Sequence, residues 1–190
     1  MPDSNTPEID PLTRPQVLAV MGMTAVLLLA VTKAWQALGS PALLPWRASA
    51  PALGLGLALA LAIAGASSLL YRWWPAYRRS ARAYLTLVLE PLVWPDLIWL
   101  GLLPGLSEEL LFRGLMLPAL GGDAAAVAVT SLLFGSLHLG GIQQWPYVVW
   151  ATCVGALLGT AAVLSGNLLV PIVAHVTTNW ISSALWKLNR

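Results

Sequence analysis

Long apolar segments recur along this chain of 190 residues from residue 17 to the C-terminus, separated by short segments rich in Pro, Gly and charged residues. A helix needs about 20 apolar residues to cross the hydrocarbon layer of a membrane, which is roughly 30 Å thick. No segment alternates apolar and polar residues as a membrane β-barrel requires. The pattern predicts an all-α, polytopic transmembrane helical bundle of about six spans, at residues 17–38, 52–70, 96–120, 124–139, 146–164 and 168–188.

The spacing of these segments predicts three regions. Residues 1–16 are polar and rich in proline, which indicates a disordered N-terminal tail. Residues 17–90 are expected to form two transmembrane helices and a basic cytoplasmic loop. Residues 91–190 are expected to form a core of about four transmembrane helices. A stretch before Pro95 is a candidate for an amphipathic helix at the membrane surface.

Composition supports a membrane protein. Hydrophobic residues make up 58% of the chain and charged residues only 9%, whereas soluble domains carry roughly 25% charged residues. The net charge is +2 and the basic residues form no long run, so nucleic acid is not an expected partner. The single cysteine, Cys153, excludes an internal disulfide and a cysteine-based metal cluster.

The basic residues predict an orientation in the membrane. Cytoplasmic loops of membrane proteins carry an excess of Lys and Arg. The loop after the second apolar run holds four arginines, whereas the preceding loop holds only Arg47. Both chain ends are then expected on the cytoplasmic side, which agrees with an even number of spans. The four arginines are Arg72, Arg78, Arg79 and Arg82.

Very few ionisable residues lie inside the apolar runs. A charge at the centre of a bilayer costs at least about 2.5–3.5 kcal/mol, and such residues normally face protein or water. The protein has two histidines, and both belong to this small group. A hydrogen-bonded packing role is the alternative for any one of them, but together they indicate a site. The group is Glu108, Glu109, Arg113, His138 and His175, with the neutral Asn179.

The third apolar run carries both glutamates. Pro104-Gly105 is expected to break the helix, so that Ser107 caps a new helix and the carboxylates meet its positive end. Glu109 and Arg113 are four residues apart and are expected to form a mainly structural ion pair. Glu108 is rotated by roughly 100° from Glu109. Glu108 therefore remains available for chemistry.

The two later motifs also place their members one helical turn apart. Phe134 is expected to pack one turn before His138, and His175 precedes Asn179 by the same interval. If the three helices converge in a bundle, their polar residues form one site. Burial raises the pKa of a carboxylate toward that of a general base, and a neutral imidazole can share a water molecule with it. An amide and a second imidazole are suitable donors to an oxyanion.

These three motifs resemble those of the CAAX protease and bacteriocin-processing family, also called the Abi family, which includes the type II CAAX prenyl endopeptidases. The family pattern is Glu-Glu-x-x-x-Arg, then Phe-x-x-x-His, then His-x-x-x-Asn or Asp, and it is complete over about residues 92–188. The resemblance implies an intramembrane endopeptidase that acts on a membrane-embedded or lipidated peptide or protein. It implies that Glu108 and His138 activate water, that His175 and Asn179 bind the oxyanion, and that Glu109 and Arg113 orient the site.

A metal-dependent mechanism is the alternative. Three protein ligands plus water make a catalytic zinc site, and Glu108, His138 and His175 are the alternative ligands. The strongest zinc-protease signal, His-Glu-x-x-His on one helix, is absent from the sequence. A metal-free glutamate mechanism without a cofactor is therefore the favoured prediction.

Two other classes of function compete with a peptidase. A non-catalytic scaffold or bacteriocin-immunity protein would use the same polar core to hold its helices together. A small transporter would also contain broken helices and buried charges, but the inverted pair of breaks expected of a repeat-built transporter is missing. The sequence does not determine whether a substrate is prenylated.

Overall fold

The computed structural model describes residues 12–39 and 42–189, and these residues form helices and connecting segments without a β-strand. Residues 1–11 of the predicted disordered tail lie outside the described residues. The all-α fold is confirmed. Its elements are α1 (Arg14–Gly39), α2 (Ala50–Trp73), α3 (Pro75–Leu89), α4 (Asp96–Glu109), the π-helix η1 (Leu110–Met116), α5 (Leu117–Ala119), α6 (Ala124–Ser136), the 3₁₀ helix η2 (Ile142–Gln144), α7 (Trp145–Ser165) and α8 (Leu169–Leu188).

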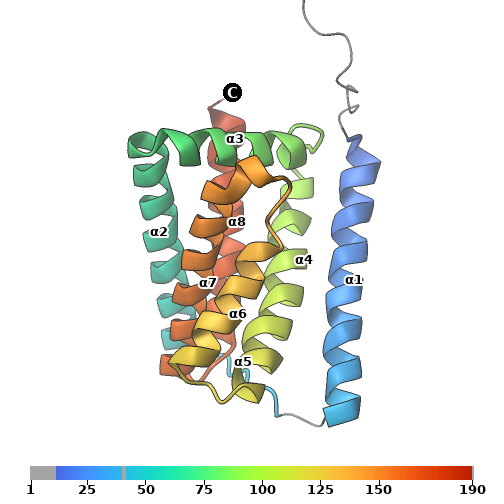
Figure 1. Cartoon of the computed structure of the whole chain (residues 1–190), viewed down its shortest axis with the longest axis vertical. Helices are drawn as coiled ribbons and strands as arrows, with labels where there is room; N and C mark the ends of the chain where they lie inside the picture. The colour runs from blue at the N-terminus through green and yellow to red at the C-terminus, as the bar shows by residue number, and fades with distance from the viewer. Residues whose placement is uncertain (1–11, 40–41, 190) are drawn as a thin grey trace, which may run out of the picture.

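The long helices run roughly side by side, and α3 lies across one end of the bundle (Figure 1). Within the described part of the chain, three helices are long and apolar enough to cross a membrane: Arg14–Gly39, Ala50–Trp73 and Ile142–Ser165. The α4, η1 and α5 helices follow one another without a gap, and α8 runs along them between the same two ends (Figure 1). The helix α6, Ala124–Ser136, is apolar but shorter. The bundle is therefore polytopic, while the count of six spans stays a prediction.

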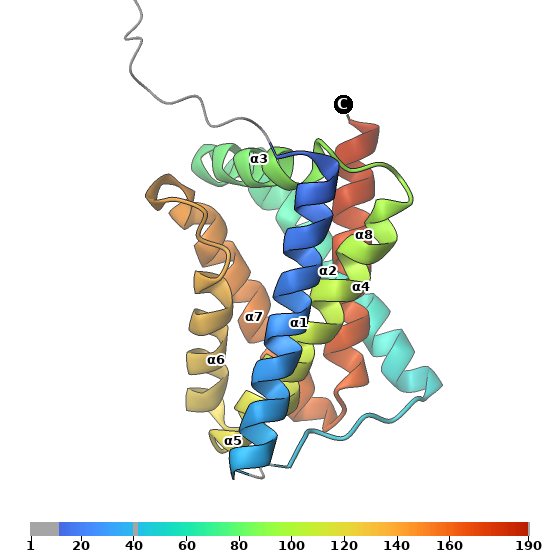
Figure 2. The ribbon, with the colours of Figure 1, turned by 90° about the vertical axis from the view of Figure 1, so that its right-hand side faces the viewer.

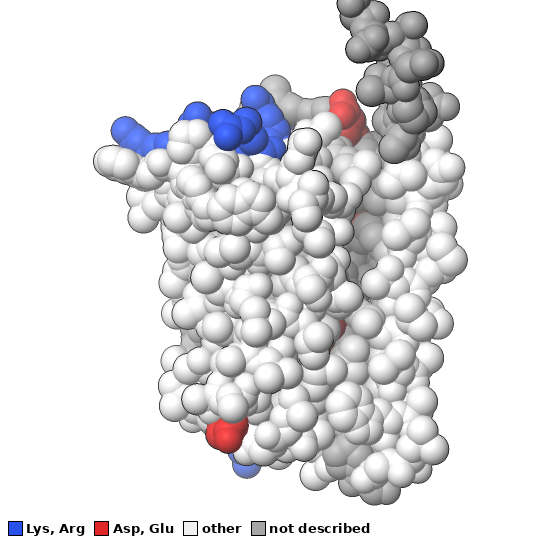
Figure 3. Space-filling model, viewed as in Figure 1, with Lys and Arg blue, Asp and Glu red and all other residues white. Residues whose placement is uncertain are grey.

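The segment predicted as a basic loop is largely helical, which corrects that prediction. Arg72 lies in the last turn of α2, and α3 begins at Pro75 after a single extended residue. Proline suits a first helical turn because its missing N–H has no partner there anyway. Along α3, Tyr77 and Ala81 are buried and the arginines are exposed. Figure 3 shows the basic residues gathered at this end, with the side of the bundle almost free of charge.

The predicted break at Pro104-Gly105 does not occur, because α4 continues through Pro104 to Glu109. The Ser107 hydroxyl donates to the Leu103 carbonyl at 2.7 Å, so Ser107 is not a helix cap. Proline has no N–H, which deprives the carbonyl of Leu100, four residues earlier, of its helical donor. The side-chain amide of Asn179 donates to that carbonyl at 3.5 Å. A neighbouring helix thus satisfies the group that the proline leaves unpaired.

Two features set how the helices meet around the core. A Cβ atom on Gly135 would lie 2.0 Å from the Thr152 hydroxyl, so α6 and α7 approach closely because Gly135 has no side chain. The α1 helix packs mainly on α4 and η1 and lies beside them in both ribbon views (Figures 1 and 2). At one end of α1, the Arg14 guanidinium makes two hydrogen bonds of 2.8 Å to the Asp96 carboxylate. A polar cavity lies between α2, α3, α4, α6, α7 and α8, and residues of all six helices line it.

Candidate active site

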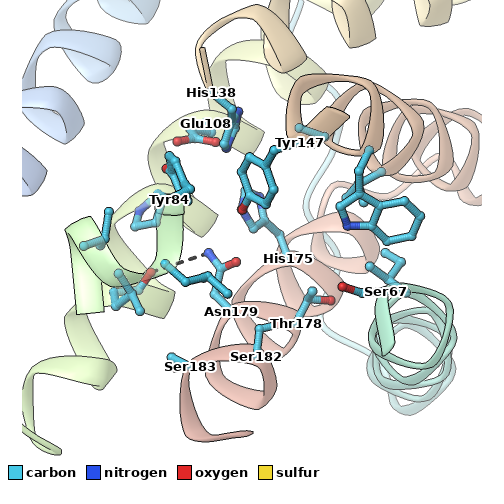
Figure 4. A pocket seen from close by; sticks show the side chains of 18 of the residues that line it. Ser67, Tyr84, Glu108, His138, Tyr147, His175, Thr178, Asn179, Ser182 and Ser183 are labelled. Atoms are coloured by element: carbon cyan, nitrogen blue, oxygen red, sulfur yellow. Dashed lines mark hydrogen bonds between the residues drawn. The ribbon is translucent and has the colours of Figure 1, made fainter. Parts of the chain in front are cut away.

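A cavity of about 170 Å³ lies inside the bundle, and its lining residues come from six helices (Figure 4). All three sequence motifs contribute to it, although the first and last lie far apart along the chain. The expected convergence of the motifs on one place is therefore present in the structure. The motif residues in its wall are Glu108, Phe134, His138, His175 and Asn179.

Glu109 and Arg113 lie behind this wall and are fully buried. A guanidinium nitrogen of Arg113 is 2.8 Å from Oε1 of Glu109, so the ion pair predicted from their spacing is present. The same oxygen lies 2.8 Å from Nδ1 of His175, a contact between residues 66 positions apart. One carboxylate thus joins the first and third motifs.

Further contacts hold the guanidinium of Arg113 in place. Its second terminal nitrogen donates to the Gly155 carbonyl at 2.9 Å, and a Cβ atom on Gly155 would lie 3.2 Å from that nitrogen. The guanidinium carbon is 4.4 Å from the centre of the Phe134 ring, a distance at which a cation is attracted to the ring face. Arg113 belongs to η1, and π-helices occur frequently at functional sites.

The contact with Glu109 determines how His175 can act. A carboxylate accepts hydrogen bonds, so Nδ1 of His175 carries the hydrogen of this contact. Nε2 is then a donor only when the ring holds a second proton. Donation to an oxyanion by His175 therefore requires the protonated ring. The sequence did not reveal this condition.

His138 is oriented by the backbone of its own motif. Its Nδ1 lies 3.0 Å from the Phe134 carbonyl, which can only accept a hydrogen bond. Nε2 of the neutral ring therefore keeps its lone pair and can accept a proton or a hydrogen bond. The rings of Phe134 and His138 have centres 5.0 Å apart. Phe134 thus contributes its carbonyl as well as the packing that was predicted.

Glu108 is separate from the Glu109 network. Its Oε2 atom is buried and makes no hydrogen bond within the described part of the chain. Figure 4 shows its carboxylate beside the imidazole of His138 at one side of the cavity. A buried polar atom normally has a partner in the protein or a bound water molecule. Glu108 and His138 therefore lie next to each other in the wall of the cavity.

Several polar residues of the cavity were missed by the sequence analysis. Tyr84 comes from α3 and Tyr147 from α7, and their rings stack with centres 4.5 Å apart. Burial, and secondarily the nearby Glu108 carboxylate, raises the pKa of Tyr84 to about 12, so its phenol is a hydrogen-bond donor at neutral pH. The others include Ser67, Tyr77, Thr178, Ser182 and Ser183.

A signal for the residues on α8 was available in the sequence. Thr178, Ser182 and Ser183 follow His175 by three, seven and eight positions, which places them on the same face of a helix. No comparable signal existed for Tyr84, because it lies in a segment whose contact with the core depends on how α3 crosses the bundle. Among residues 12–39 and 42–189, no three His, Cys, Asp or Glu side chains form a group that could hold a metal ion.

Part of the chain is similar to a known protein family. Residues 90–181 match the family described as type II CAAX prenyl endopeptidase Rce1-like. This confirms the family resemblance. The matched segment contains all three motifs and begins shortly before α4. No solved structure matches the chain significantly.

A curated relative is the uncharacterized protein YpbD of Bacillus subtilis (strain 168). It is 29% identical to this chain over 110 residues, which cover 58% of this chain and 56% of the relative. The aligned part thus spans little more than half of the relative's length.

Proposed function

We propose that this protein is an intramembrane endopeptidase that hydrolyses a peptide bond of a membrane-associated peptide or protein. The proposal rests on the two side chains that lie next to each other in the cavity wall, Glu108 and His138. The Oε2 atom of Glu108 is buried and has no hydrogen-bond partner among the described residues, and Nδ1 of His138 is hydrogen-bonded to the Phe134 carbonyl. The match to a family of endopeptidases supports the same function.

The proposed reaction uses one water molecule. Nε2 of His138 accepts a hydrogen bond from the water molecule and so holds it in place. Glu108 accepts a proton from this water, and the water oxygen forms a bond to the carbonyl carbon of the substrate. The tetrahedral intermediate then loses its C–N bond. The proton held by Glu108 passes to the departing nitrogen, which leaves an amine on one product and a carboxylic acid on the other.

Hydrogen-bond donors are required where negative charge develops on the substrate oxygen. The protonated His175 ring, supported by Glu109, is one donor in this proposal. The Asn179 amide has two N–H bonds, and the long contact to Leu100 occupies one of them. The phenol of Tyr84 is a further donor in the cavity wall.

The proposed peptidase function is tested by comparing the membrane proteomes of cells with the wild-type protein and with the Glu108→Gln protein. A cleavage that disappears when Glu108 is replaced by Gln is the expected result.

A metal-free mechanism predicts that cleavage survives chelation. Purified protein should keep its cleavage rate within about twofold after treatment with a strong chelator and removal of the chelated metal, because Glu108 rather than a metal ion acts on the water. Metal content and rate are measured on the same sample. Loss of activity with the metal, and its recovery on addition of zinc, would contradict the mechanism.

We further propose that α3 and both chain ends lie on the cytoplasmic side. The exposed arginines of α3 and the C-terminal end of α8 lie at the same end of the bundle (Figures 1 and 3). In a Cys153→Ser background, Asn189→Cys should react with a membrane-impermeant maleimide in inside-out vesicles but not in intact cells. Arg47→Cys, at the other end, is the matched control and should show the opposite result. The reverse labelling would invert the proposed orientation.

A further inference from the structure

The exposed side of α3 carries a cluster of positive charge. Arg82 follows Arg78 by four positions and Arg79 by three, so the three side chains lie on one side of the helix. All three residues are exposed. None of them forms an ion pair with an acidic side chain among residues 12–39 and 42–189. Their charge is therefore available to a partner outside the described residues.

The location of these arginines favours a membrane surface as the partner. The α3 helix lies across one end of a bundle whose side is almost free of charge, and the basic residues gather at that end (Figures 1 and 3). The opposite side of α3 packs on the bundle, where Tyr77, Ala81 and Leu89 are buried. A helix with one apolar and one basic side lies along the boundary between lipid head groups and hydrocarbon.

A hollow beside Arg79 offers a place for one head group. It opens between α3 and the segment that leads into α7, and its lining includes Arg79, Gln143 and Trp145. The Ser80 hydroxyl joins the two sides, because it donates to the Gln144 carbonyl at 3.1 Å. A guanidinium donates charge-assisted hydrogen bonds to phosphate oxygens, and the Gln143 amide is a further donor. The hollow therefore suits a phosphate group.

Exposed apolar side chains in the same hollow distinguish a lipid from a soluble anion. Ile142 lines the hollow and is 84% exposed, and Trp145 is 53% exposed. The Trp145 ring makes an edge contact with Trp74 at 5.8 Å between ring centres, which holds it beside α3. Tryptophan is enriched at the depth of lipid head groups, and burial of Ile142 against an acyl chain is favourable. An acidic protein or a nucleic acid would use the arginines but not these apolar side chains.

We propose that the exposed side of α3 and the adjoining hollow bind an anionic phospholipid. Arg79 and Arg82 contact its phosphate, and its acyl chains lie against Ile142 and Trp145. The inference concerns binding alone and does not rest on the peptidase function. Since Tyr84 of α3 lines the active-site cavity, the lipid binds to a helix that forms part of the candidate active site.

The test measures the lipid bound to the full chain in detergent. Purified protein is mixed with equal amounts of phosphatidylglycerol and phosphatidylcholine and passed through gel filtration, and its bound lipid is quantified by mass spectrometry. Each arginine near an anionic lipid surface strengthens binding by about fivefold, so the wild-type protein should retain at least about tenfold more phosphatidylglycerol. The double variant Arg79→Gln, Arg82→Gln should reduce this ratio to about twofold or less. Arg79→Lys, Arg82→Lys keeps the charge and should retain most of the preference.

A matched control removes two positive charges at the other end of the bundle. Lys33 lies near the end of α1 that is remote from α3, and Arg47 follows in the connection to α2. The double variant Lys33→Gln, Arg47→Gln changes the net charge by the same amount and should leave the lipid ratio unchanged. Circular dichroism establishes that each variant is helical.

Three results would overturn the proposal. The first is a lipid ratio that Arg79→Gln, Arg82→Gln leaves unchanged, or a wild-type protein that retains the two lipids equally. The second is displacement of phosphatidylglycerol by inorganic phosphate, which would indicate a site for a free anion. The third is retention of a polyglutamate peptide as strong as that of phosphatidylglycerol, which would indicate an acidic protein partner.

Discussion

Replacement of Glu108 by Gln is expected to lower the rate of peptide cleavage by about 10²–10⁴-fold, the usual contribution of a general base. Gln has nearly the same shape as Glu but cannot accept a proton from water. The Oε2 atom of Glu108 makes no hydrogen bond within the described residues, so the substitution should leave the fold intact. The rate is measured with a reporter substrate in vesicles, and the fold by thermal unfolding of the purified protein.

A matched control is Glu90→Gln, which removes an exposed carboxylate at the end of α3. The control should cleave at the wild-type rate. If the Glu108→Gln protein also cleaves at that rate, Glu108 is not the base. If cells with the Glu108→Gln protein show the full biological effect of the wild-type protein, a non-catalytic scaffold explains the polar core better than a peptidase.

Replacement of Arg113 by Met is expected to lower the free energy of unfolding by about 3–5 kcal/mol, as found when one partner of a buried ion pair is removed. Arg113 and Glu109 are both fully buried, so the variant takes the guanidinium away from the Glu109 carboxylate, which keeps its contact with His175. It also removes the hydrogen bond to the Gly155 carbonyl. Unfolding of the purified protein in detergent, followed by circular dichroism, measures the effect.

The double variant Glu109→Leu, Arg113→Met tests the cause of that loss. Removal of both charges avoids an uncompensated buried carboxylate, so the double variant should be more stable than Arg113→Met alone. Arg82→Met, on the exposed side of α3, is the control and should change stability by no more than about 0.5 kcal/mol. A double variant that is less stable than the single one would show that shape, rather than charge, holds this part of the core.

These two predictions give Glu108 a catalytic role and Glu109 a structural one, and the sequence already indicated these different roles. Successive helical residues point in different directions, so Glu109 was paired with Arg113 and Glu108 was left for chemistry. The structure contains the Glu109–Arg113 ion pair. It also shows why local spacing was insufficient for His175. Its contact with Glu109 joins residues 66 positions apart, and no periodicity along either helix predicts which faces of two helices will meet.

The helix containing Pro104 shows a similar limit. A proline removes one helical hydrogen bond and its ring crowds the carbonyl four residues earlier, which bends or breaks many helices, but in a membrane protein a neighbouring helix can supply the missing donor. Asn179, from a distant part of the chain, supplies that donor, and α4 continues through the proline. The same amide was assigned to the oxyanion from the sequence alone. The structure shows that one of its N–H groups also serves the backbone.

The sequence by itself determined the all-α fold, the approximate positions of the long helices and the residues of the three motifs. It could do so because apolar runs report burial in a membrane and because spacing of four residues reports a shared helical face. Only the tertiary structure decided that the motifs face one cavity, and that Tyr84 of the surface helix α3 and the hydroxyl-bearing residues of α8 line it. These properties depend on how six helices pack together, which is a relation among distant segments that no local pattern contains.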